Sequence, residues 1–385
     1  MKRITINNAD DLKKFIQTQE DSRQQAFAVF ITSRAALRLA VFPLRFFQLS
    51  SAVYKNDLTS IFNWRGYLLS SLATLRMEHL YESTSVDIVG SLLKNSDYVA
   101  DIERDAFEIL IFLFDIIEDK EHWRLLVSLE KHSPNEIWAQ ITIDAELWFE
   151  HADQGDGTLA INIAPLWSNE NPLEQDWHAL REKLLAADTP DPRGADWSFW
   201  VKWYDDILAG NPQNWDMLHE IATTDAIDWD ASAREVNDTI NLIVERYRFR
   251  DEVVALRREV EQLRSATQYP PRNHNNPPEL VANAPEVQEH LTIVWAAAFE
   301  AEKELGKPKP DPTILSKVGN IILDFGIWFA QYCGKKADLA IDSTLTTVIK
   351  WGIPAGGGYL LASNPQKVAE LGKQLMNFAS KLGVF

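Results

Sequence analysis

Residues 249–264 read FRDEVVALRREVEQLR, and this stretch decides the fold class of the chain. Its apolar positions recur four and three residues apart, which is the spacing of one face of an α-helix. Charged residues flank that face, as they do beside a coiled-coil seam. The seam covers about two heptads, fewer than sustained coiled coils show, so it either pairs with a second copy or packs against its own domain. Its apolar positions are Phe249, Val253, Leu256, Val260 and Leu263.

Helix-start signals recur elsewhere in the chain. Each places a capping residue before a proline, whose fixed φ and missing N–H suit the first helical position. Such pairs occur at Ser133-Pro134, Asn171-Pro172, Asn211-Pro212, Asp311-Pro312 and Asn364-Pro365. After the first two, Glu136 and Glu174 stand where a side chain can return a hydrogen bond to the cap. We therefore predict a mainly α fold made of several helical modules.

Residues 141–163 are ambiguous between helix and strand. Apolar and polar residues alternate from Ile141 to Phe149, and Gly155 and Gly157 would turn such a strand back into a small β-hairpin. One helical stripe is present in the same stretch, formed by Trp138, Ile141, Ala145 and Trp148. Because the stripe directly follows the cap at Ser133, we favour a helix.

Composition predicts four segments. An N-terminal helical domain covers residues 1–187, and a loop rich in Pro, Asp and Gly leads to a Trp-rich helical module at 196–264 that ends in a long helix. Residues 265–278 hold four prolines and three asparagines, which cannot continue a helix, so residues 265–284 are predicted to be a linker. A C-terminal helical unit with apolar, Gly-containing helices covers residues 285–385.

Charge and cysteine content restrict the partners and the location. The 385 residues are 46% apolar, which predicts a sizeable core, and the formal charge of −18 repels phosphate backbones. We therefore expect no nucleic-acid partner. The single cysteine, Cys333, forms no intrachain disulfide, and the N-terminus lacks the pattern of a secretory signal. We predict a cytoplasmic protein. A peripheral location at the inner membrane is the alternative.

Residues 22–56 contain basic residues and no acid on an aromatic background. Such a segment binds anionic ligands or lipid headgroups, and the candidates for this contact are Arg34, Arg38 and Arg45. The alternative is pairing inside one bundle with the eight acidic residues of segment 101–121. We favour pairing, because arginine stems usually lie along apolar surface and the guanidinium groups find local partners.

Tryptophan is concentrated in the middle of the chain. Trp197, Trp200 and Trp203 stand three residues apart, which places them along one helical face. Such a stripe forms an aromatic cage, an interface or, most often, a core. The segment 186–232 contains ten acids and two bases, which suggests a basic protein partner, although a solvated surface is the commoner explanation.

Signatures of catalysis are missing from the sequence. The pairs Asp119/His122 and Asp216/His219 have the wrong residue type or spacing for a di-iron bundle. Neither a Gly-x-Ser-x-Gly motif nor a phosphate-binding P-loop occurs. We therefore predict that the chain is not an enzyme and that it uses no metal and no cofactor.

The C-terminal segments 318–334 and 345–361 are apolar, interrupted by glycines, and carry only isolated charges. No uncharged run reaches the roughly 18 apolar residues that span a bilayer. Gly319 and Gly326, seven residues apart, share one helix face and would allow another helix to approach closely. Buried helices of a bundle have the same pattern, as do segments that contact membranes after assembly. The candidates for membrane activity are Gly319, Gly326, Trp328 and Trp351.

A resemblance covers about 90 residues in the middle of the chain. It is carried by the WSFWVKWY stretch at 197–204, by Asn214-Trp215-Asp216-Met217-Leu218, by Ile221-Ala222, and by the HNNPPE sequence at 274–279. In these residues the chain resembles a group of uncharacterised bacterial proteins that share the Trp-rich module and the linker. The resemblance implies a bacterial cytoplasmic context and a module joined to variable ends, and it implies no catalytic residue.

Together these patterns predict a non-enzymatic, oligomer-forming interaction or effector protein that senses a protein partner and responds through its C-terminal helices. One alternative is a membrane-permeabilising, pore-like effector that uses residues 311–385. A second is an enzyme whose site matches no known motif. The interface candidates are Trp197, Trp200, Trp203, Phe249, Val253, Leu256, Val260 and Leu263.

Overall fold

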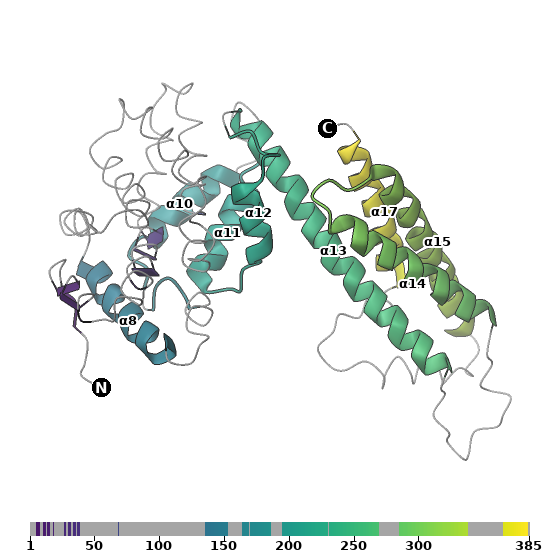
Figure 1. Ribbon diagram of the computed structural model, residues 1–385, viewed down its shortest axis with the longest axis horizontal. Coiled ribbons are helices and arrows are strands. Elements are labelled where there is room, and N and C mark those ends of the chain that lie inside the picture. Colours follow the sequence, from purple (N-terminus) through teal and green to yellow (C-terminus); the bar gives the residue numbers. More distant parts are fainter. Residues whose placement is uncertain are drawn as a thin grey trace, which may run out of the picture. The chain divides into compact units, whose positions relative to one another are not determined.

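The structure is a computed structural model (Figure 1). It describes residues 135–152, 164–168, 170–185, 195–229, 231–268, 285–337 and 365–383, together with scattered positions between 5 and 38 and Leu68. The chain splits into two compact units, residues 1–241 and 242–385.

The described part of the chain is mainly α-helical and contains no strand, which confirms the predicted fold class. In the first unit the helices are α8 (Asn135–Ala152), α10 (Glu174–Leu185), α11 (Ser198–Ala209) and α12 (Trp215–Thr223). Helix α13 (Ala233–Gln268) begins in the first unit and ends in the second. The second unit continues with α14 (Pro285–Leu305), α15 (Pro312–Ala337) and α17 (Pro365–Leu382).

Residues 141–152 lie within α8, so the β-hairpin that alternation suggested for this stretch is wrong at its first strand. The helical stripe prevails because Trp138, Ile141, Ala145 and Trp148 are all buried on one side of the helix. The remainder of the suggested hairpin, residues 153–163, lies outside the described residues.

Local caps set several helix starts. Asp311 caps α15, since its Oδ1 accepts the N–H of Thr313 at 2.8 Å, and α15 begins at Pro312 as predicted. The pair Asn211-Pro212 starts no helix, because α12 begins at Trp215 and the N–H of Met217 binds the side chain of Asn214. The sequence reading also missed a capping box before α13. In it, Glu235 Oε2 accepts the N–H of Ser232 at 3.1 Å, and Ser232 Oγ accepts the N–H of Glu235 at 3.3 Å.

Buried polar contacts tie the first unit together. Trp200 donates its indole N–H to Asn237 Oδ1 at 2.9 Å, which joins α11 to the start of α13. Tyr204 donates its hydroxyl hydrogen to the carbonyl oxygen of Leu37 at 2.9 Å. Helix α11 ends at Ala209 and is capped by Gly210, whose φ of 71° is left-handed and therefore suits glycine.

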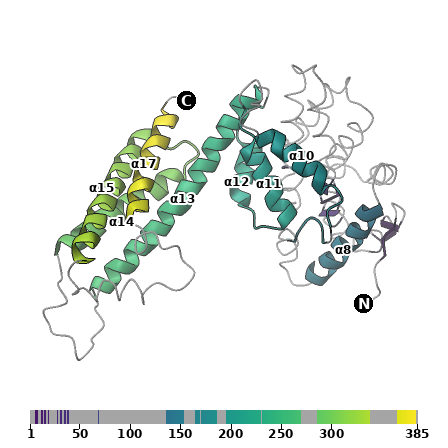
Figure 2. The ribbon, with the colours of Figure 1, turned by 180° about the vertical axis from the view of Figure 1, so that it is seen from behind.

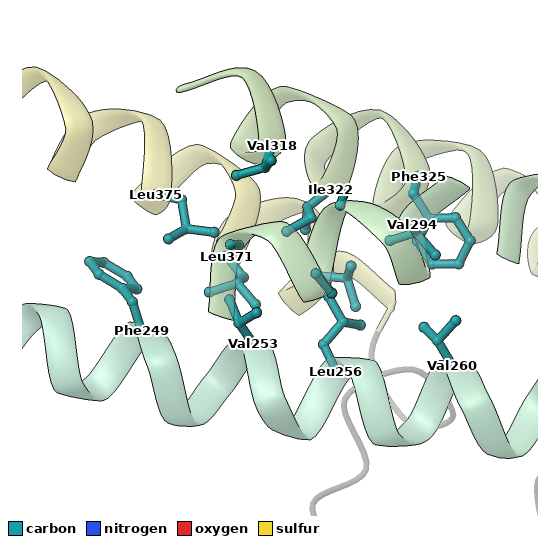
Figure 3. Packing of buried hydrophobic residues seen from close by; sticks show 14 of the residues in the cluster. Phe249, Val253, Leu256, Val260, Val294, Val318, Ile322, Phe325, Leu371 and Leu375 are labelled. Atoms are coloured by element: carbon teal, nitrogen blue, oxygen red, sulfur yellow. The ribbon is translucent and has the colours of Figure 1, made fainter. Parts of the chain in front are cut away.

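The second unit is a bundle in which the later part of α13 packs with α14, α15 and α17, and the four helices run side by side in both views (Figures 1 and 2). In its core, aliphatic and aromatic side chains from all four helices pack between one another (Figure 3). Phe249, Val253, Leu256 and Val260 come from α13, and they face Val294 of α14, Val318, Ile322 and Phe325 of α15, and Leu371 and Leu375 of α17.

The boundary between the units falls inside the predicted Trp-rich module. Val236, Asn237 and Ile240 are buried in the first unit, whereas the seam from Phe249 onward is buried in the second. The first part of α13 therefore contributes side chains to the core of the first unit, and its later part contributes side chains to the core of the second unit. Helix α13 continues to Gln268, so the first residues assigned to the linker are helical, and residues 269–284 lie outside the described part.

The turn between α14 and α15 is fixed by side chains on both sides. Buried Glu304 accepts the N–H of Asp311 at 2.6 Å and pairs with Lys307 Nζ at 2.6 Å. Arg246 of α13 donates from Nη1 to the carbonyl oxygen of Lys307. These contacts therefore connect α13, α14 and α15 at this end of the bundle.

Candidate interaction surface

Arg34 and Arg38, predicted to contact an anion or a lipid, lie one helical turn apart inside the first unit and are both buried. Asp144 of α8 lies between them, with Oδ1 3.1 Å from Arg34 Nε and Oδ2 2.6 Å from Arg38 Nη2. Arg34 also donates to the carbonyl oxygens of Ala164 and Pro165, and Arg38 Nε donates to that of Leu166 at 2.8 Å.

The same cluster explains a perturbed arginine. Complete burial lowers the pKa of Arg38 to about 10, although the charge of Asp144 opposes the shift. At neutral pH Arg38 is still protonated, so its charge is held away from water beside Asp144. Arg34 and Arg38 are internal partners of Asp144, which corrects their assignment as anion- or lipid-contact residues. Arg45 and the acidic segment 101–121 lie outside the described residues.

The Trp-rich stripe belongs to the core of the first unit. Trp197, Trp200 and Trp203 are all buried, with Trp200 packed edge-on against Phe199 and Trp203. This placement confirms the favoured interpretation of the stripe as core. The three side chains are therefore not exposed to a protein partner.

The seam on α13 is likewise internal. Phe249, Val253, Leu256, Val260 and Leu263 are buried among α14, α15 and α17. Of the two interpretations left open by the sequence, packing against the same domain is therefore the one that the fold contains. These five residues are corrected from interface candidates to core residues, because a side chain already enclosed by its own chain offers no free surface.

Gly319 and Gly326 allow α15 and α17 to approach closely, as their spacing predicted. A Cβ added at Gly319 would lie 2.9 Å from the carbonyl oxygen of Gly372, and one added at Gly326 would lie 2.7 Å from Cα of Ala369. Trp328 is half-buried and stacks on His290 of α14, with ring centroids 3.9 Å apart. Trp351 lies outside the described residues.

Among the described helices, Pro312–Tyr332 of α15 is long and apolar enough to cross a membrane by length and composition. Its outer face is mostly polar, however, with Ser316, Lys317, Asn320 and Asp324 exposed on the same side as Ile327. Such a face is typical of an amphipathic helix that buries one side in a bundle. Contact with a membrane stays a prediction.

Within the described part of the second unit, three large apolar side chains are strongly exposed, of which two lie on the outer face of α14 and the third, Ile327, lies on α15 and is 46% exposed. Ile293 is 47% exposed and Phe299 is 50% exposed, and the small, exposed Ala296 stands midway between them. We call the exposed residues Glu289, Thr292, Ile293, Ala296, Phe299, Glu300 and Lys303 the α14 face. It could not be selected from the sequence, where Ile293 and Phe299 are indistinguishable from the core residues beside them.

Neighbouring side chains hold Phe299 in position. Its ring stacks on Trp295 at 5.7 Å with an angle of 2° between the planes. Arg264 lies over the Trp295 ring at 5.1 Å, and Arg257 lies 5.9 Å from the Phe299 ring while Arg257 Nε pairs with Glu302 at 2.6 Å. Because these contacts restrict its rotation, Phe299 loses little further entropy if a partner covers it.

Glu252, on the α13 surface, gives a pH-dependent prediction. Partial burial raises its pKa, Arg248 opposes the rise, and Glu370 of α17 adds to it. An acid whose pKa is higher in the folded state destabilises the fold once it ionises, so this penalty is present above the folded pKa and disappears below the unfolded pKa. We expect Glu252→Gln to raise Tm slightly at neutral pH and to lose that gain in mild acid, as measured by calorimetry at several pH values.

Glu245 is the matched control on the same helix. Its carboxylate pairs with Lys381 Nζ at 2.7 Å, so Glu245→Gln removes an attraction and should lower Tm at neutral pH. Equal effects of the two substitutions would contradict the opposite environments assigned to them.

Within the described residues no group of three or more His, Cys, Asp or Glu side chains is placed to hold a metal ion. Asp216 and His219 lie on α12, and Asp119 and His122 are outside the described part. In comparisons with known proteins, the chain matches no family model, no curated protein and no solved structure.

Proposed function

We propose that the chain is a non-enzymatic interaction protein that self-associates through its second unit. The observation that supports this proposal is the α14 face, which groups two large apolar side chains that are each about half exposed, Ile293 and Phe299, whereas the described residues of α15 expose one, Ile327. Exposed apolar residues grouped on one helix face are typical of protein contact sites, and anchored aromatic rings are common at the centres of such sites. The sensing of a further protein partner remains part of the proposal without an assigned surface.

One helix face is a small contact area, so the association is expected to be weak and reversible. Sedimentation velocity of the full chain from about 1 µM to about 1 mM covers the dissociation constants expected of such a contact. The sedimentation coefficient should rise with concentration. A single monomeric species over the whole range would overturn the proposal.

A pair of matched variants tests whether the second unit is responsible. Changing Ile293 and Phe299 to serine should return the protein to a monomer without unfolding it, since both side chains are half exposed already. The control is Leu185→Ser, because Leu185 is 41% exposed but lies on α10 of the first unit. Equal loss of association in both proteins would contradict the choice of surface.

A further inference from the structure

Two charges on the α14 face, Glu289 and Lys303, show a self-complementary order, whereas the third, Glu300, has the neutral Thr292 as its counterpart across Ala296. Glu289 stands seven residues before Ala296, and Lys303 stands seven residues after it. Both side chains are exposed, and neither makes an ion pair within the part of the chain that the structure describes. Ile293 and Phe299 are arranged in the same way, three residues before and three residues after Ala296.

Such an order has a simple geometrical consequence. Consider two antiparallel copies of the helix related by a two-fold axis at Ala296. A residue that stands a given number of positions before Ala296 in one copy then lies opposite the residue that stands the same number of positions after Ala296 in the other copy. Glu289 of one copy then lies opposite Lys303 of the other, about 10 Å from the axis along the helix. Ile293 and Phe299 of the two copies come to equal heights beside the central pair of alanines, whose small side chains let the helices approach.

We propose that the occupant of the α14 face is a second copy of this chain, bound antiparallel with the two-fold axis at Ala296. This inference rests on the proposed function and specifies its interface. A second copy is favoured over an unrelated partner because Glu289 and Lys303 are placed symmetrically about Ala296 with opposite charges, which a foreign surface does not require. The symmetry also repeats the Glu289–Lys303 pair, so the dimer gains two ion pairs from one pair of residues.

Charge exchange tests the pairing directly. Glu289→Lys alone places two lysines together at both ends of the interface, and Lys303→Glu alone places two glutamates together. Each single variant should weaken the dimer roughly tenfold in sedimentation velocity, and the double variant that carries both changes should restore it. Unchanged far-ultraviolet circular dichroism and Tm serve as the folding controls, since both residues are exposed.

Cysteine cross-linking tests the position of the axis. In a background with Cys333→Ser, Ala296→Cys should form a disulfide-linked dimer under mild oxidation, because its two copies meet at the axis within the span of a disulfide. Glu289→Cys alone should not, because its two copies are about 21 Å apart along the helices. Mixing Glu289→Cys protein with Lys303→Cys protein should yield the cross-linked pair.

The outcomes separate the two proposals. A protein that is monomeric at every concentration overturns both the proposed function and this interface. A protein that associates, but whose dimer ignores charge exchange and fails to cross-link at position 296, retains self-association and overturns the α14 arrangement. Protection of Phe299 in a strictly monomeric protein would instead show that another part of the same chain covers the face.

Discussion

Changing Asp144 to asparagine should lower the free energy of unfolding of the first unit by about 3–5 kcal/mol. Asp144 is fully buried and is the carboxylate that both Arg34 and Arg38 contact. Asparagine keeps the shape of the side chain but removes its charge. The two guanidinium groups would then remain away from water without the carboxylate charge that both contact, and that loss is much larger than the loss of a surface ion pair.

Urea denaturation followed by tryptophan fluorescence is the suitable measurement, because most of the described tryptophans lie in the first unit. Asp206→Asn is the matched control. Asp206 pairs with Lys202 at 2.6 Å, but the Lys202 side chain is 77% exposed, so the loss should stay below about 1 kcal/mol. If the two variants were equally stable, the buried cluster would have no special energetic role.

The Arg38–Asp144 pair also shows where sequence reasoning stops. Arginine stems on an apolar helix face predicted an internal partner for the basic segment, and an internal partner is what Arg34 and Arg38 have. The sequence pointed to the acids of segment 101–121, which lies outside the described residues, whereas the acidic partner seen within the described part is Asp144 of α8. Local patterns report that a charge must be paired when it is buried, but they carry no information on which distant residue supplies the pair.

A helix-start signal within one turn predicted the start of a helix where no second cap lay close by. Asp311-Pro312 starts α15, because cap and first turn are adjacent in sequence and need no tertiary contact. The same signal at Asn211-Pro212 starts no helix, since Asn214 caps α12 one turn later. Two good caps compete there, and local propensity does not decide between them.

Helix spacing identified the seam on α13, but not its partner. The alternation from Phe249 to Leu263 is the same for a coiled-coil dimer and for a bundle core, since both bury a stripe at 3.5–3.6 residues per turn. The choice depends on whether other helices of the chain can cover the stripe, and α14, α15 and α17 do so. The α14 face was missed for the same reason, because exposure is a property of the assembled bundle.

The second large effect is expected at Gly372 of α17. In an ordinary helix, glycine to alanine stabilises by about 1 kcal/mol because alanine loses less backbone entropy. At Gly372 the added Cβ would lie 2.6 Å from the carbonyl oxygen of Gly319 and 2.8 Å from Cα of Leu323. These are backbone atoms of α15, which cannot rotate away as the end of a side chain can. We therefore expect Gly372→Ala to be destabilising, with a net loss of about 2 kcal/mol or more in the second unit.

Gly306→Ala provides the comparison that separates clash from propensity. Gly306 follows α14, and a Cβ there meets only carbonyl oxygens of the preceding turn, Glu302 O and Lys303 O, both at an ordinary 3.5 Å. Thermal unfolding followed by circular dichroism should show a lower Tm for Gly372→Ala and a nearly unchanged one for Gly306→Ala. If Gly372→Ala instead raised Tm, α15 and α17 would have to be farther apart than the fold places them. The glycines would then serve another purpose than close packing, because a helix pair with room for a methyl group gains the full benefit of alanine.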